Sequence, residues 1–81
     1  MVTTLITDVL DEEVICMASE VQSGDQIFFF GTNKGNIHKY NLTTGVMTLL
    51  AGPLANMITS MNIYSSVLYV GMDNGDFYKV T

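Results

Sequence analysis

Residues 31–41 read GTNKGNIHKYN, and residues 71–81 read GMDNGDFYKVT. The two stretches align without a gap and share the frame G-x-[ND]-x-G-[ND]-[IF]-[HY]-K. Gly beside Asn or Asp is typical of a tight turn between two antiparallel strands. The frame therefore predicts the same strand, turn and strand twice, and it predicts structural turn positions for four glycines, Gly31, Gly35, Gly71 and Gly75.

Short segments rich in Val, Ile, Thr, Phe and Tyr fill the rest of the chain and are bounded by Gly, Asn, Asp and Ser. This pattern is typical of an all-β protein. Residues 5–17 also carry Leu and Val at helical spacing, but the β-branched residues at the start of the chain favour a strand there. We expect eight strands, near residues 2–7, 14–19, 26–31, 36–41, 45–50, 57–62, 66–71 and 76–80.

The internal repeat extends beyond the shared frame. Three further pairs of segments align: residues 2–7 with 46–51, 14–17 with 57–60, and 27–31 with 67–71. The first copy carries three extra residues within residues 19–25. A period of about forty residues with four strands is typical of a propeller blade. Residues 1–81 are therefore predicted to form one two-blade unit, with repeat 1 at about 2–41 and repeat 2 at about 45–81.

The segment of residues 25–45, DQIFFFGTNKGNIHKYNLTTG, resembles strands b, c and d of a WD40 repeat. In that family a Gly ends strand b, an acidic-Gly turn follows, and strand c closes on Trp-Asp before a Thr-Gly turn. Here Tyr40-Asn41 stands in place of Trp-Asp, as does Val80-Thr81 in the second copy, and residues 51–53 replace the family's Gly-His pair. The resemblance covers nearly the whole chain and implies four-stranded antiparallel propeller blades.

In this family the outer strand of each blade belongs to the next sequence repeat. The resemblance therefore implies one complete blade and a second blade, from residue 57 onward, that lacks its outer strand. Two blades would also leave apolar faces uncovered, because a blade buries its faces only against its neighbours. We expect residues 2–7 of a neighbouring copy to complete the second blade and close a ring of six or eight blades, a homotrimer or a homotetramer. The expected interface residues are Val2, Thr3, Thr4, Leu5, Ile6, Thr7, Phe77, Tyr78, Lys79 and Val80.

The charge of the chain is −5, from three Lys, no Arg and eight acidic residues. Such a chain lacks the cations that neutralise phosphates, which argues against nucleic acid and anionic membranes as partners. The single cysteine excludes a disulfide framework within the chain, and no basic region precedes the first apolar residues. We expect a cytoplasmic or otherwise intracellular protein.

The only charge cluster consists of Asp8, Asp11, Glu12 and Glu13. It is either a binding site for a cation or a basic segment of a partner protein, or a solvated loop that keeps an apolar chain in solution. No EF-hand spacing accompanies it. We keep these four residues as the candidate partner-binding site.

Three residue types, cysteine, histidine and lysine, are considered for chemistry. Cys16 is a nucleophile in principle, with His38 as its base, but both residues lie in expected strands, where packing explains them as well. Lys39 and Lys79 occupy the same place in the two repeats, either paired with acidic groups or on the surface. No phosphate loop, zinc spacing or triad pattern is present, so no enzyme, metal or cofactor is predicted.

The function implied by the resemblance is a non-enzymatic scaffold whose loop faces bind another protein. The alternative is a propeller that binds small ligands or glycans between its blades. Exposed aromatic side chains usually form such sites, and without Trp the four tyrosines would have to serve. These are Tyr40, Tyr64, Tyr69 and Tyr78.

Overall fold

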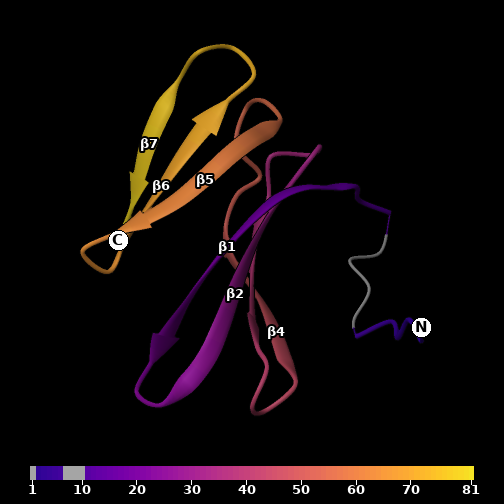
Figure 1. Cartoon of the computed structure of the whole chain (residues 1–81). Helices are drawn as coiled ribbons and strands as arrows, with labels where there is room; N and C mark the ends of the chain where they lie inside the picture. Colours follow the sequence, from indigo (N-terminus) through magenta and orange to yellow (C-terminus); the bar gives the residue numbers. More distant parts are fainter. Residues whose placement is uncertain (1, 7–10) are drawn as a thin grey trace.

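The computed structural model describes residues 2–6 and 11–81, which contain seven β-strands and no helix (Figure 1). The seven strands expected from residue 14 onward are all present. Residues 2–6 lie outside any strand, so the eighth expected strand is not formed over them in the single chain, and Thr7 lies outside the described residues. The strands are β1 (Val14–Gln22), β2 (Asp25–Thr32), β3 (Ile37–Asn41), β4 (Val46–Ala51), β5 (Ile58–Tyr64), β6 (Val67–Met72) and β7 (Phe77–Val80).

The strands form two antiparallel sheets in simple chain order. The first sheet has four strands, β1-β2-β3-β4, and the second has three, β5-β6-β7. The all-β prediction is confirmed at this level, as is the unequal division into four strands and three. The second sheet therefore ends at β7, whose outer edge has no strand beside it among the described residues.

The turns between β2 and β3 and between β6 and β7 are built alike, as the repeated frame predicts. Thr32 donates its backbone N–H to the carbonyl of Asn36 at 3.0 Å, and Met72 donates to Asp76 at 2.9 Å. The left-handed glycine of each turn, Gly35 with φ 79° or Gly75 with φ 92°, donates back to the Thr32 or Met72 carbonyl at 3.2 Å. A positive φ favours glycine at both positions. The other two glycines expected at turns, Gly31 and Gly71, lie inside β2 and β6.

The strand pairing corrects the sequence alignment of the first hairpin of each sheet. Val14 pairs with Thr32, and Ile58 pairs with Met72, each just before a β-bulge. The counterpart of Val14 is therefore Ile58 and not residue 57, because a bulge shifts the pairing by one residue without a mark in the sequence. The first copy is four residues longer than the second rather than three.

The four extra residues lengthen the strands and leave the turn unchanged. Both hairpins turn through two residues with positive φ, Ser23 and Gly24 (51° and 84°) or Ser65 and Ser66 (52° and 63°). Two such residues make the tight turn that matches the twist of paired strands. The extra residues within 19–25 therefore form no longer loop, and β1 and β2 pair as far as Gln22 and Asp25.

The core lies between the two sheets. Since side chains alternate along a strand, Ile27, Phe29 and Ile37 leave one face of the first sheet and meet a face of the second sheet. That facing surface is built from Ile58, Leu68, Val70 and Met72. We call these two facing surfaces the inner faces, and the opposite sides of the two sheets the outer faces.

Candidate functional site

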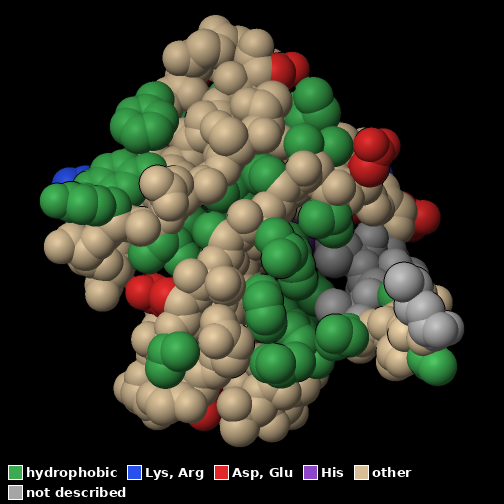
Figure 2. Space-filling view, viewed as in Figure 1, with side chains coloured by type: hydrophobic (Ala, Val, Ile, Leu, Met, Phe, Trp, Pro, Cys, Tyr) green, Lys and Arg blue, Asp and Glu red, His purple; other side chains and the backbone are tan. Residues whose placement is uncertain are grey.

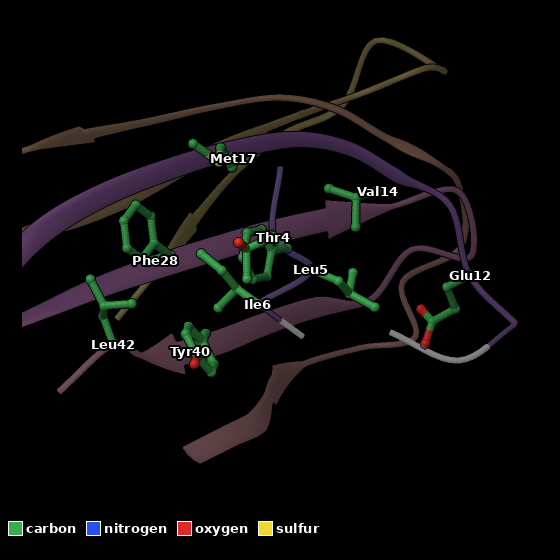
Figure 3. A pocket seen from close by; sticks show the side chains of 10 residues that line it. Thr4, Leu5, Ile6, Glu12, Val14, Met17, Phe28, Tyr40 and Leu42 are labelled. Carbon is green, nitrogen blue, oxygen red and sulfur yellow. The ribbon is translucent and has the colours of Figure 1, made fainter. Parts of the chain in front are cut away.

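The outer face of the first sheet is an apolar surface with a hollow of 460 Å³ (Figure 3). Phe28 lies opposite Tyr40, and Phe30 lies opposite Met17, so these four side chains share one face. Met17 remains 58% exposed, whereas Tyr40 is buried. Figure 2 shows hydrophobic side chains gathered over this sheet. A large uncovered apolar surface is typical of an interaction site.

The N-terminal segment lies at this hollow without covering it. Thr4, Leu5 and Ile6 line the hollow, and Figure 3 shows Ile6 near Phe28 and Tyr40, with Leu5 on the side of Val14 and Glu12. Leu5 is nevertheless 81% exposed and Ile6 65% exposed. Residues 2–6, the described part of the segment expected to exchange between copies, are thus all exposed in the single chain.

Glu12 occupies the rim of the hollow and connects the segment before β1 to β2 and β3. Thr32 Oγ1 and Asn36 Nδ2 each donate to Glu12 Oε1 at 2.8 Å, and His38 Nε2 lies 3.2 Å from Glu12 Oε2. The bond from Asn36 lowers the pKa of Glu12, with help from Thr32 and from positive charge on His38, while partial burial opposes the shift. Hydrogen bonds to the charged form favour the carboxylate, so this group is poised to stay ionised.

The other members of the acidic cluster point elsewhere. Asp11 is exposed and has a φ of 61°. Glu13 is also exposed and contacts Asn33 through its backbone, with its N–H donating to Asn33 Oδ1 at 2.9 Å. Asp8 lies outside the described residues. Among the described members, Asp11 and Glu13 are therefore the acids available to a partner, because Glu12 already holds its hydrogen-bond donors.

The outer face of the second sheet has a more polar hollow that combines aromatic and hydrogen-bonding side chains. The rings of Tyr69 and Phe77 stack with their centroids 5.8 Å apart. Ser60 and Asn62 lie beside them on β5, and Gly71 leaves the backbone open between them. Phe77 is 73% exposed although it is a large apolar side chain.

The edge strand β7 carries the C-terminal residues expected at the interface. Phe77, Tyr78 and Lys79 are exposed, and Val80 is half-buried against the core. Lys79 lies opposite Tyr69 on the outer face. Its repeat partner Lys39 lies on the inner side of the first sheet, beside a shallow hollow at β4. Among the described residues, neither lysine forms an ion pair.

The structure separates the two residues considered for nucleophilic chemistry. Cys16 lies opposite Gly31, whereas His38 lies opposite Phe30, so their side chains leave opposite faces of the first sheet. Burial raises the pKa of the Cys16 thiol, which disfavours the reactive thiolate. His38 therefore does not act as a base for Cys16 within one chain.

Sequence reasoning missed Thr32 and Asn36 as partners of Glu12. The two repeats differ at these places, with Met72 in place of Thr32 and Asp76 in place of Asn36. In the second copy Tyr78 and Asn74 donate to Asp76 instead, at 3.3 Å and 2.9 Å. The available signal was the polar Thr32 at a place where the second copy has the apolar Met72.

Comparison with protein-family models, with curated proteins and with solved structures found no match for this chain. In the part of the chain that the structure describes, no helix has the length and apolar character needed to cross a membrane. No group of His, Cys, Asp and Glu side chains suited to a metal ion occurs among residues 2–6 and 11–81. The candidate functional surfaces of the described residues are therefore the two outer faces and the edge of β7.

Proposed function

We propose that this chain assembles head to tail with copies of itself into a closed β-propeller, two blades per chain, which serves as a non-enzymatic scaffold for a protein partner. One observation carries the proposal. Within the chain, the inner face of the first sheet packs on the inner face of the second sheet, and the repeat counterparts of these two faces are the two outer faces, which stay uncovered. Phe29 on the inner face of the first sheet has Tyr69 on the outer face of the second sheet as its repeat counterpart. Conversely, Leu68 on an inner face has Phe28 on an outer face as its counterpart.

Suppose that the first sheet of a second copy packs on the second sheet of this chain in the way that the second sheet packs on the first. The contact would then bury the outer face of the second sheet in one copy and the outer face of the first sheet in the next. The outer face of the first sheet would contribute Met17, Phe28 and Phe30, whose repeat counterparts Met61, Leu68 and Val70 pack in the core. The other side would bring Tyr69 and Phe77. Burial of an aromatic or aliphatic side chain contributes about 1.5–3 kcal/mol, and several would be buried at each contact.

Such a contact uses different surfaces on its two sides, so it stays soluble only if the rotation closes into a ring. Two blades per chain restrict the ring to even numbers, and propellers usually have about four to eight blades. A homotrimer of six blades and a homotetramer of eight blades both satisfy this condition. The edge of β7 would accept residues 2–7 of the neighbour as the outer strand, in the way that β3 accepts β4.

The ring would repeat each loop once per chain around its rim. Asp11 and Glu13 are exposed where the chain enters the first sheet, so each copy would add two acidic groups there. A basic segment of a protein partner matches this charge, and such charges chiefly govern association rate and specificity.

Native mass spectrometry of the whole chain tests the assembly. We expect one discrete species of three or four copies, and a chain that stays monomeric at every concentration would overturn the proposal. Removal of residues 1–8 should abolish the discrete species. A truncated chain that keeps the full copy number would reject strand exchange.

Two proline variants refine the test without shortening the chain. Proline has no backbone N–H, so Thr4→Pro and Leu5→Pro each remove one hydrogen-bond donor. The N–H groups of neighbouring residues point to opposite sides of a strand, so only one of these two donors would face β7. One of the two should therefore disrupt assembly while the other is tolerated. Because residues 2–6 form no strand in the single chain, neither proline should alter its thermal unfolding when it is dilute.

The second candidate function is glycan or small-ligand binding on the outer face of the second sheet. The stacked Tyr69 and Phe77 rings beside Asn62 offer an apolar surface with hydrogen-bonding groups, as ligand sites do. In the proposed ring this surface would be covered. Titration with a panel of monosaccharides, followed by tyrosine fluorescence, distinguishes a scaffold from a ligand-binding protein. Saturable binding to a monomeric chain that is lost in Tyr69→Ala would favour ligand binding.

A further inference from the structure

We infer that Val14 of one copy packs directly on Gly71 of the next, in the place that Ile58 takes on Gly31 within the chain. This inference rests on the head-to-tail assembly proposed above and specifies its register. The residues come from β1 of one copy and β6 of the other. A second copy of this chain therefore covers the outer face, and the contact between Val14 and Gly71 sets its position.

The template is the contact of Ile58 with Gly31. A Cβ atom at position 31 would lie 2.8 Å from Ile58 Cβ and 2.9 Å from Cys16 Sγ, and closer still to Ile58 Cγ2. Real Cβ atoms do not approach other atoms so closely, and Ile58 is fully buried. Gly31 does not have a positive φ, so space and not backbone conformation requires a glycine there.

Gly71 has half of the same surroundings. A Cβ atom there would lie 2.5 Å from Ser60 Oγ, and Ser60 is the counterpart of Cys16 in the strand pairing. No residue of another sheet approaches it among the described residues. Gly71 does not have a positive φ either, and a serine hydroxyl can rotate away from an added methyl group. Within the single chain, nothing requires glycine at position 71.

Val14 is the residue that would fill the missing half. It precedes the bulge of β1 as Ile58 precedes the bulge of β5, and both are β-branched. Ile58 is fully buried, whereas Val14 is 47% exposed at the hollow of the outer face. A second copy in the repeat-related position brings this half-exposed side chain onto the open backbone of Gly71.

The first test exchanges the large and the small partner. Gly71→Ala should weaken assembly on the order of tenfold to a hundredfold per contact, because overpacking a close contact is costly. Val14→Gly should also weaken assembly, through lost burial. The double variant should assemble more tightly than Gly71→Ala alone, because removal of the Val14 side chain makes room for the new methyl group.

The matched control is Val46→Ala. Val46 lies on the outer strand β4 and stays 55% exposed even though its strand borders the covered side of the first sheet. Val46 lies opposite Asn41, and Asn41 lies opposite Ile27, so the Val46 side chain leaves the inner face, away from the outer face that a second copy would cover. Copy number and affinity should therefore not change in Val46→Ala. Sedimentation velocity over a dilution series measures all four chains.

A second test uses a disulfide and remains valid if Gly71→Ala unfolds the chain. Val14→Cys and Gly71→Cys are combined with Cys16→Ser, a change for which the counterpart Ser60 is a natural precedent. Disulfides need Cβ atoms about 3.5–4.5 Å apart, so the close contact has to widen by about 1 Å. Mild oxidation should give linked species up to the full copy number on a non-reducing gel. Val46→Cys with Gly71→Cys, in the same background, should give none.

The outcomes separate this inference from the assembly itself. Cross-linking at 14 and 71, together with rescue in the double variant, supports the contact. A wild-type chain that assembles while Gly71→Ala assembles equally well and the cysteine pair does not link overturns the contact and leaves the ring standing. A wild-type chain that never assembles overturns both.

Discussion

Glu12 Oε2 lies 3.2 Å from His38 Nε2 and so connects the segment before β1 to the middle of the first sheet. The other carboxylate oxygen accepts hydrogen bonds from Thr32 and Asn36. Thr32 is fully buried, and its hydroxyl also accepts the N–H of Asn36 at 3.2 Å. One carboxylate thus joins three segments of the chain at the rim of the apolar hollow.

Glu12→Gln should destabilise the single chain by about 1–2 kcal/mol, because hydrogen bonds to a charged acceptor contribute more than those to a neutral one. Urea unfolding in dilute solution measures the difference. Glu13→Gln is the matched control, since Glu13 is exposed and bonds to Asn33 only through its backbone. Equal effects of the two changes would contradict a special role for Glu12.

The stabilisation by Glu12 should depend on pH. Its pKa in the folded chain is lowered from the ordinary value of a glutamate, chiefly by the hydrogen bond from Asn36. A group with a lowered folded pKa contributes stability that is present above its unfolded pKa and lost as the pH falls through the folded pKa. The stability difference between wild type and Glu12→Gln should therefore be constant near pH 7 and shrink below about pH 4.5.

Gly31→Ala should destabilise the single chain, whereas Gly71→Ala should not do so comparably. The new methyl group at position 31 would meet Ile58 and Cys16, and overpacking of this kind costs about 1–3 kcal/mol. At position 71 it meets only the rotatable hydroxyl of Ser60. Thermal unfolding of both variants, at concentrations where the wild type is monomeric, provides the comparison. An equal loss at both positions would show that the single chain already requires Gly71.

Ile37→Ala should be among the most damaging single changes. Ile37 is fully buried between the sheets, and removal of such a side chain costs about 2–5 kcal/mol. Val46→Ala, at a position 55% exposed, should change stability by less than about 0.5 kcal/mol. Chemical denaturation of both variants measures the contrast, and similar midpoints would place the core elsewhere.

Much of the fold followed from local patterns. The repeated Gly and Asn or Asp frame predicted the turns at Gly35 and Gly75, and short segments rich in β-branched and aromatic residues, bounded by turn residues, predicted the seven strands that the structure contains from residue 14 onward. The ends of the strands and the length of the first hairpin were less well predicted. A bulge and a longer pairing change the register without changing composition.

The sequence by itself thus determined two related antiparallel units, because hairpin turns and strand-forming segments depend on neighbouring residues. Only the tertiary structure decided that Val14 corresponds to Ile58, that Glu12 bonds to Thr32, Asn36 and His38, and which faces remain uncovered. These relations join residues far apart in the chain, so they depend on how the sheets pack. Residues 2–6 also show this dependence on distant residues, because a strand needs a neighbouring edge to pair with and residues 2–6 have none in the single chain. In our proposal, they pair with β7 of another copy.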